Sequence, residues 1–222
     1  MAMISASILN ADFTCLAKTA DLIETAGADA VHFDVMDGIF VNNLSFGLPV
    51  LESLRRYTAL PIDVHLMIQE PLRFVERFVS AGAQYLSFHI ESQSDPVQTL
   101  QAIHSHGIPA GIAVSPGTDV EKVFPLIPEM DEEDFFLMMT VEPGWGKQPF
   151  IPEVLPKIRK LSGEIRKKHR RLHIEVDGGI NAETSLLCRQ AGADYIVSGS
   201  YLLSAKDPAE AVRLLRGDKS DI

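Results

Sequence analysis

The sequence predicts an α/β protein folded as a single (β/α)8 barrel, and three observations support this prediction. Short runs rich in Val, Ile and Phe alternate with helical stretches along the whole chain. These runs are almost continuously apolar, which is typical of parallel strands that helices cover on both faces. The tripeptide Ala-Gly-Ala recurs ahead of strands, at residues 26–28, 81–83 and 191–193, with no break in composition between the units.

The expected strands and helices alternate in a regular order. The strands are the short apolar runs, at residues 3–8, 30–35, 61–66, 84–89, 109–114, 135–141, 172–177 and 194–198. The helices lie between them and carry apolar residues at positions i, i+3 and i+4. They are expected at residues 15–26, 49–57, 71–81, 96–106, 119–127, 152–169, 182–191 and 207–215.

The Ala-Gly-Ala repeats indicate how a helix passes into the next strand. Gly27, Gly82 and Gly192 are expected to end helices, where a left-handed residue is needed. Eight such units favour a closed barrel of the TIM type. The alternative is an open, doubly wound sheet, which usually has fewer strands, but SILNADF stands after the first strand in place of a Gly-x-Gly-x-x-Gly motif. We expect one domain over residues 1–222, with a frayed polar tail at about residues 216–222.

Composition and charge argue against several classes of protein. The 222 residues carry 20 Lys and Arg against 30 Asp and Glu, a net charge of −10, and show no basic stripe with interleaved aromatics, so no nucleic-acid partner is expected. The two cysteines, Cys15 and Cys188, form no Cys-x-x-Cys motif, and a reduced, cytoplasmic setting is the simplest expectation. Neither a signal peptide nor a membrane span of roughly 18 apolar residues is expected, so no membrane partner is predicted.

Two histidines and two aspartates stand at the ends of three expected strands. His32 and Asp34 are two residues apart and therefore share one face of their strand, while His65 and Asp177 lie near the ends of two others. Imidazole and carboxylate groups together form a ligand set for one divalent metal, and the two carboxylates could also move protons. A constellation of this kind at the strand ends of a barrel is typical of an active site.

Seven motifs around these residues carry a resemblance to a known family. In chain order they are SASILNADF, HFDVMDGIFVNN, DVHLM, GIAVSPGT, MTVEPGWGKQPF, EVDGGI and VSGS. The set resembles the ribulose-phosphate 3-epimerase family over residues 3–215. The resemblance implies a TIM barrel of the ribulose-phosphate binding type and a metal-dependent isomerase of carbohydrate metabolism. The implied reaction is the C3 epimerisation of D-ribulose 5-phosphate to D-xylulose 5-phosphate, a step of the pentose phosphate pathway.

The resemblance also assigns roles to the four strand-end residues. His32, Asp34, His65 and Asp177 match the family's metal ligands, with Zn²⁺ expected and Fe²⁺ or Mn²⁺ as alternatives. Asp34 and Asp177 match the family's two catalytic acid–bases, one on each side of the sugar. Proton transfer at C3 would pass through an enediolate that the metal stabilises.

Further residues match positions that contact the substrate in the family. The expected substrate-binding residues are Ser7, His65, Met36, Met67, Gly144, Trp145, Gly146, Lys147, Gly178, Gly179, Gly199 and Ser200. The methionines would keep the reacting part of the sugar dry, and the serine at position 7 would contact a hydroxyl. The glycines follow the sixth, seventh and eighth strands, where backbone N–H groups can approach a phosphate closely.

Some residues near this set keep two interpretations. Met139 either packs around the substrate with the other methionines or belongs to the ordinary barrel core. His89 and Glu91, at the end of the fourth strand, are expected to form hydrogen bonds beside the ligand set or at the barrel mouth. Residues 37–43 are expected to form a loop that folds over substrate as a lid.

Because the sequence departs from the commonest family pattern at three positions, the identity of the sugar substrate stays open. Asn42 stands where Pro is usual, Trp145 replaces Phe, and Lys147 replaces Gly. The side chain of Lys147 either strengthens phosphate binding or points to solvent. One alternative is an epimerase of another ketose phosphate such as D-allulose 6-phosphate, because the stretch QPFIPE at residues 148–153 occurs in a similar form there.

Two more distant alternatives have a different chemistry. A non-catalytic sugar-phosphate barrel is disfavoured by the intact ligand set. A decarboxylase such as orotidine-phosphate decarboxylase is disfavoured because DVHLMIQ, at residues 63–69, lacks the lysine of its Asp-x-Lys-x-x-Asp array. The family further implies a sugar-phosphate partner and assembly into a homo-oligomer.

Overall fold

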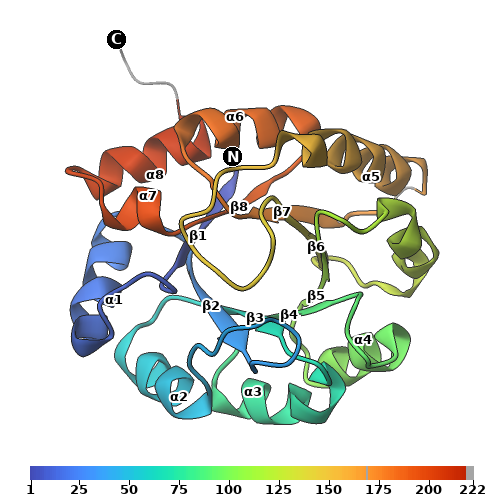
Figure 1. Cartoon of the computed structure of the whole chain (residues 1–222), viewed down its shortest axis with the longest axis horizontal. Helices are drawn as coiled ribbons and strands as arrows, with labels where there is room; N and C mark the ends of the chain where they lie inside the picture. Colours follow the sequence, from blue (N-terminus) through green and yellow to red (C-terminus); the bar gives the residue numbers. More distant parts are fainter. Residues whose placement is uncertain (169, 219–222) are drawn as a thin grey trace.

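The structure, a computed structural model, describes residues 1–168 and 170–218. Eight parallel strands close into a barrel in chain order, since Ile4 of the first strand pairs with Ile196 of the last (Figure 1). The strands are β1 (Met3–Ser7), β2 (Ala30–Met36), β3 (Ile62–Met67), β4 (Tyr85–His89), β5 (Ala110–Val114), β6 (Phe135–Met139), β7 (His173–Asp177) and β8 (Tyr195–Ser198). The predicted (β/α)8 barrel is therefore confirmed.

Helices form a ring outside the strands (Figure 1). They are α1 (Leu16–Thr25), α2 (Leu48–Tyr57), α3 (Val75–Ala81), α4 (Pro96–His104), α5 (Leu155–Lys167), α6 (Ala182–Ala191), α7 (Ser200–Leu203) and α8 (Pro208–Arg216). Asp95, Asn181 and Asp207 cap the first turns of α4, α6 and α8 by accepting backbone N–H groups. The largest apolar cluster lies between strands and helices and combines residues such as Phe33 and Leu51.

The glycines of the Ala-Gly-Ala repeats adopt the expected conformation. Gly82 and Gly192 are the C-caps of α3 and α6, with φ of 114° and 118°. Gly27 follows α1 with φ of 79°. Each of these positive φ values costs glycine less than any residue with a Cβ atom, so the chain can leave the helix and enter the next strand within a few residues.

The structure differs from the predicted helices in a few places. The α-helix expected at residues 119–127 is instead the 3-10 helix η3 (Val120–Glu129), because Pro125 and Pro128 lie inside it and lack the N–H that an α-helix needs. Three further 3-10 turns, η1 (Phe13–Cys15), η2 (Pro71–Phe74) and η4 (Pro152–Val154), precede α1, α3 and α5. The short helix α7 was not expected. Of the predicted tail, residues 219–222 lie outside the described residues, and residue 216 ends α8.

The barrel interior has an apolar side and a polar side. Alternate residues of β5 and β6 form a small inner apolar cluster with the next loop: Ala113, Phe135, Leu137, Met139 and Val141. Strands β1, β2, β3, β4 and β7 bury polar groups instead: Ser5, Ser7, His32, Asp34, Asp63, His65, Ser87, His89 and Glu175. Burying polar groups costs free energy unless they are hydrogen-bonded or bind a ligand, so the polar side must be held by specific contacts.

Strand register aligns the functional residues at one end of the barrel. Asp34 on β2 pairs with His65 on β3, and Met139 on β6 pairs with Asp177 on β7. These positions lie at or near the carboxyl ends of the strands. The loop between β6 and η4 crosses over the centre of the barrel in Figure 1 and covers this end.

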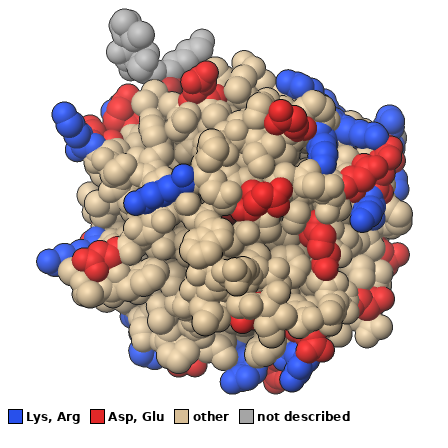
Figure 2. Space-filling view, in the orientation of Figure 1, with Lys and Arg blue, Asp and Glu red and all other residues tan. Residues whose placement is uncertain are grey.

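Charged side chains of both signs lie on the exterior of the barrel (Figure 2). On the face shown in Figure 2, basic and acidic side chains are scattered among each other, and the coloured residues form no continuous basic stripe. Within residues 1–168 and 170–218, we find no helix with the length and apolar character needed to cross a membrane.

Candidate active site

Barrel closure brings the four expected metal ligands together from β2, β3 and β7. One ligand atom from each of His32, Asp34, His65 and Asp177 lies within 4.8 Å of the others. Asp34 Oδ1 lies 3.2 Å from His32 Nε2 and 3.1 Å from His65 Nδ1. Asp177 Oδ2 lies 4.0 Å from His32 Nε2. The predicted set therefore surrounds one centre.

The chemistry of His32 fits a metal at this centre. Its Nδ1 lies 2.6 Å from Asp63 Oδ2, and an N–H donated there leaves a lone pair on Nε2. His32 Nε2 is buried, and although Asp34 Oδ1 lies 3.2 Å away, no group forms a hydrogen bond of acceptable geometry with it, which is rare for a buried polar atom. A cation coordinated by this nitrogen would satisfy it. Two imidazoles and two carboxylates suit Zn²⁺, Fe²⁺ or Mn²⁺, so the residues present fit a divalent metal.

The two aspartates differ in their affinity for a proton. Burial by itself raises the pKa of Asp34, but the imidazoles of His32 and His65 outweigh burial and hold the pKa far below its usual value. For Asp177, burial and then the charge of Asp34 act in the same direction and raise the pKa to about 7. Two carboxyl groups whose environments separate their pKa values are typical of acid–base catalysis.

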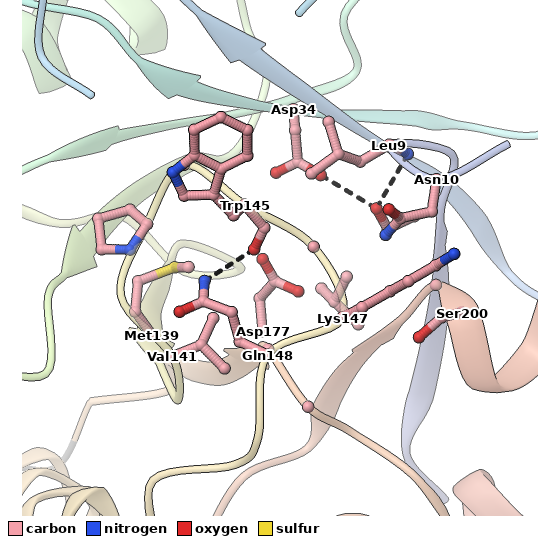
Figure 3. Close-up of a pocket in the computed structure, with 18 of the residues that line it drawn as sticks. Leu9, Asn10, Asp34, Met139, Val141, Trp145, Lys147, Gln148, Asp177 and Ser200 are labelled. Atoms are coloured by element: carbon pink, nitrogen blue, oxygen red, sulfur yellow. Dashed lines mark hydrogen bonds between the residues drawn. The ribbon is translucent and has the colours of Figure 1, made fainter. Parts of the chain in front are cut away.

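The expected substrate-binding residues line one cleft of about 540 Å³ above the metal ligands. The cleft lining includes every predicted substrate residue except His65, which is fully buried. Asp34 and Asp177 both point into the cleft from different strands (Figure 3).

Three predicted residues shape the floor of the cleft. Met36 and Met67 are 5% and 2% exposed and pack with Val41. Ser7 Oγ donates a hydrogen bond to Asp34 Oδ2 at 3.0 Å. The floor therefore combines apolar methionine side chains with the carboxylate of Asp34, whose Oδ2 is held in place by the hydrogen bond from Ser7.

The sequence of the chain matches proteins of a known family. The model of the ribulose-phosphate 3-epimerase family matches residues 3–203. The chain belongs to this family. It is 45% identical to the cytoplasmic isoform of ribulose-phosphate 3-epimerase from rice over 97% of this chain and 93% of that protein. It is 42% identical to the ribulose-phosphate 3-epimerase of Bacillus subtilis over 99% of this chain and all of that protein. Family membership confirms the prediction of an epimerase, a carbohydrate isomerase.

Solved structures resemble the barrel more distantly. A 3-hexulose-6-phosphate synthase from Salmonella typhimurium superposes with a TM-score of 0.71 over 98% of this chain and 97% of its own, at 17% identity. A 3-keto-L-gulonate-6-phosphate decarboxylase from Vibrio cholerae superposes with a TM-score of 0.72 at 14% identity, over 97% and 96% of the two chains. At such low identity these matches support the fold alone.

Below the cleft, this epimerase buries two carboxyl groups that were not among the expected site residues, although both belong to the quoted motifs. Asp63 and Glu175 lie with His32 so that one atom of each is within 4.8 Å of the others. Burial, and then the charge of Asp63, raise the pKa of Glu175 well above its usual value. Strand alternation carried the signal for both, since Asp63 is two residues before His65 and Glu175 two before Asp177.

The glycine pair after β7 is required by close packing. Gly178 has φ of 116°, and a Cβ atom there would lie 2.4 Å from the side chain of Val141. Gly179 has φ of 65°, and its Cβ atom would lie 2.7 Å from the backbone nitrogen of Phe150. Only glycine fits this turn without displacement of its neighbours, and it leaves the backbone exposed to the cleft.

The loop after β6 is braced by side-chain amides. Gln148 Nε2 donates to the carbonyl oxygens of Glu142 and Trp145 at 2.6 and 2.8 Å (Figure 3). Asn43 Nδ2, from the loop after β2, donates to the carbonyl oxygen of Gly144 at 2.8 Å. The predicted lid segment therefore meets the β6 loop across the mouth of the barrel. Gln148 was not among the expected site residues, although it belongs to the quoted motif.

Lys147 departs from the family pattern at a position with a special backbone. Its φ is 59°, in the left-handed region where glycine is more easily accommodated. The residue lines the cleft, and its side chain runs towards Ser200 (Figure 3). Asn10, a residue not expected at the site, lies beside this loop, because a Cβ atom at Gly146 would be 2.0 Å from its Nδ2.

Proposed function

We propose that this protein interconverts D-ribulose 5-phosphate and D-xylulose 5-phosphate by epimerisation at C3. The observation that carries the proposal is the pair of carboxyl groups, Asp34 and Asp177, that enter one cleft from different strands beside His32 and His65. The names of the relatives from rice and Bacillus subtilis support the same reaction.

The proposed chemistry is a two-base proton transfer. One of Asp34 and Asp177 removes the proton from C3, which breaks the C–H bond and leaves the electron pair shared with the C2 ketone. The other returns a proton to C3 on the opposite face, so the configuration inverts and no atom is gained or lost. Because each carboxyl group serves one face, the sugar does not turn over between the steps.

A divalent cation held by His32, Asp34, His65 and Asp177 would stabilise the negative charge that develops on the ketone oxygen. We propose Zn²⁺, with Fe²⁺ and Mn²⁺ as alternatives that the same ligands suit. Met36 and Met67 would exclude water beside the reacting carbons. Ser7, which already holds one oxygen of Asp34, would contact a substrate hydroxyl.

Phosphate binding is assigned to the loops after β6, β7 and β8. The net charge of −10 repels a sugar phosphate at long range, so local donors must supply the attraction. Two of the proposed donor side chains belong to Lys147 and Ser200. The other proposed donors are the backbone N–H groups of these loops: Gly144, Trp145, Gly146, Lys147, Gly178, Gly179, Gly199 and Ser200.

Three broader expectations belong to the same proposal. We propose one barrel domain over residues 1–222, because all eight strands share one closed sheet. A cytoplasmic location is proposed from the unpaired cysteines and the name of the rice relative. Assembly into a homo-oligomer is proposed from the family resemblance.

The substrate can be tested by comparing kcat/KM for ribulose 5-phosphate and allulose 6-phosphate on metal-loaded protein. The expected result is a preference for the pentulose. A tenfold preference for the hexulose, which corresponds to about 1.4 kcal/mol in transition-state binding, would reverse the assignment. No turnover of either sugar, with metal bound, would instead support a non-catalytic barrel.

A further inference from the structure

The metal ligand His65 is the first member of a hydrogen-bonded chain that leads away from the metal centre. Its Nε2 lies 2.9 Å from Nε2 of His89 on β4, and the two rings stack with centroids 5.0 Å apart. Nδ1 of His89 lies 3.1 Å from Oε2 of Glu91, just beyond the strand. We call these three residues the orienting chain.

The outer end of the orienting chain is a firmly placed carboxylate. The other oxygen of Glu91, Oε1, accepts the backbone N–H of Ser115 at 2.9 Å. His89 is fully buried, while the side chain of Glu91 is 23% exposed. Burial raises the pKa of Glu91, but the hydrogen bonds from His89, Thr118 and the backbone of Ser115 together outweigh it and lower the pKa to about 2, so at neutral pH Glu91 is an acceptor only.

Proton counting fixes the direction of these bonds. A hydrogen bond between two imidazole nitrogens contains one proton, which belongs to one ring or the other. Nδ1 of His89 lies nearer to Oε2 of Glu91, at 3.1 Å, than to the hydroxyl oxygen of Ser115, at 3.4 Å. Since Glu91 accepts only, this geometry favours an N–H on His89 Nδ1, and Nε2 of His89 is then an acceptor. The proton between the rings therefore belongs to His65 Nε2, which leaves the lone pair on His65 Nδ1.

His65 Nδ1 is the atom that faces Asp34 in the metal centre. A cation between Nδ1 and the carboxylate needs this lone pair, whereas an N–H on Nδ1 would block coordination. We propose that Glu91, acting through His89, is a positioning residue that holds His65 in the metal-binding tautomer and thereby raises metal affinity. This inference rests on the proposed metal centre.

Exchange of Glu91 for Gln tests the proposal. Gln offers an oxygen at only one of the two positions that Oε1 and Oε2 of Glu91 occupy beside Ser115 and His89. If its oxygen stays with the N–H of Ser115, its NH₂ group faces His89 and would reverse the order of protons along the chain. We expect Glu91→Gln to weaken Zn²⁺ binding by about tenfold or more in competition with a chromophoric chelator.

Asp194→Asn is a matched control at the opposite end of the barrel. Asp194 Oδ2 lies 2.7 Å from His173 Nδ1, and Oδ1 accepts the N–H of Ile174 at 2.8 Å, the same arrangement without a link to the metal ligands. Its Zn²⁺ affinity should stay within about twofold of the original protein. Equal affinities for the Glu91 variant and the original would overturn the orienting chain.

A second measurement needs no variant. In Zn²⁺-loaded protein, ¹⁵N NMR shifts of the imidazoles should show a protonated Nδ1 and an unprotonated Nε2 for His89. An N–H on His89 Nε2 would contradict the proposed order even if the Glu91 variant failed to fold. If the unaltered protein bound none of Zn²⁺, Fe²⁺ and Mn²⁺, the proposed metal centre would fail, and the orienting chain with it.

Discussion

At the scale of single residues, the site depends on identical side chains in different surroundings. Asp34 and Asp177 carry the same carboxyl group, but Asp34 lies between two imidazoles, whereas Asp177 lies near another carboxylate. The sequence pattern predicted both residues as ligands and acid–bases. It contained no information on their pKa values, because those depend on neighbours from other strands.

Replacement of either aspartate should remove activity. We expect Asp34→Asn and Asp177→Asn each to lower kcat at least about a hundredfold, since a positioned acid or base contributes 10²–10⁴-fold. Turnover would be followed in a coupled assay and metal content by elemental analysis. Asp21→Asn, on the outer helix α1, is the control. A variant with metal bound and near-original kcat would contradict the two-base mechanism.

Lys147 offers a separate test of phosphate binding. Because its side chain lines the cleft and runs towards Ser200, we expect Lys147→Gly to raise KM several-fold at low salt. The rise should shrink at high salt, where charge interactions are screened. Lys147→Met keeps the length without the charge and should behave alike. An unchanged KM in both variants would show that the lysine side chain points to solvent and does not bind the phosphate.

At the scale of elements, period-two alternation sorts each strand between helix-facing and barrel-facing residues. On β6, Phe136 and Met138 belong to the outer cluster, while Phe135, Leu137 and Met139 belong to the inner one. Apolar runs predicted the strands but not this division, because both faces are buried.

The α-helix predicted at residues 119–127 was wrong in type. Its apolar spacing is that of an α-helix, but its prolines lack the N–H groups that an α-helix needs, and the segment forms a 3-10 helix.

A glycine on β5 should be essential to the packing of the inner cluster. A Cβ atom on Gly111 would lie 2.4 Å from the ring of Phe135 and 2.6 Å from Cβ of Ser87. Gly111→Ala should therefore lower the free energy of unfolding by about 1–3 kcal/mol, as overpacking does. Urea denaturation measures this change. Gly117→Ala, where no atom lies within 4 Å, is the control and should be nearly neutral. Equal stabilities would disprove the packing argument.

At the scale of the whole molecule, ion pairs at the other end of the barrel make stability depend on pH. The hydrogen bond with Asp194, opposed by partial burial, raises the pKa of His173 above its ordinary value. The folded protein therefore binds this proton more tightly than the unfolded chain does. The resulting stabilisation is complete below the unfolded pKa of about 6.5 and is lost as pH rises through the folded value.

Asp194→Asn should expose this effect. The variant should lose more unfolding free energy relative to the original protein at pH 6 than at pH 9. The difference between the two pH values should be about 1 kcal/mol or less, because both groups are partly exposed. Paired urea titrations at the two pH values provide the measurement. A larger loss at pH 9 would show that the sign is wrong.

The sequence by itself determined the alternation of strands and helices, the glycine caps and the four residues proposed as metal ligands. These follow from local spacing and from motifs that occupy short stretches of chain. Tertiary structure alone decided that β7 joins β2 and β3 around one centre, that His32 Nε2 has no partner, and that Glu91 reaches His65 through His89. Distances, burial and proton order arise only when strands remote in sequence are brought into contact, so local patterns cannot specify them.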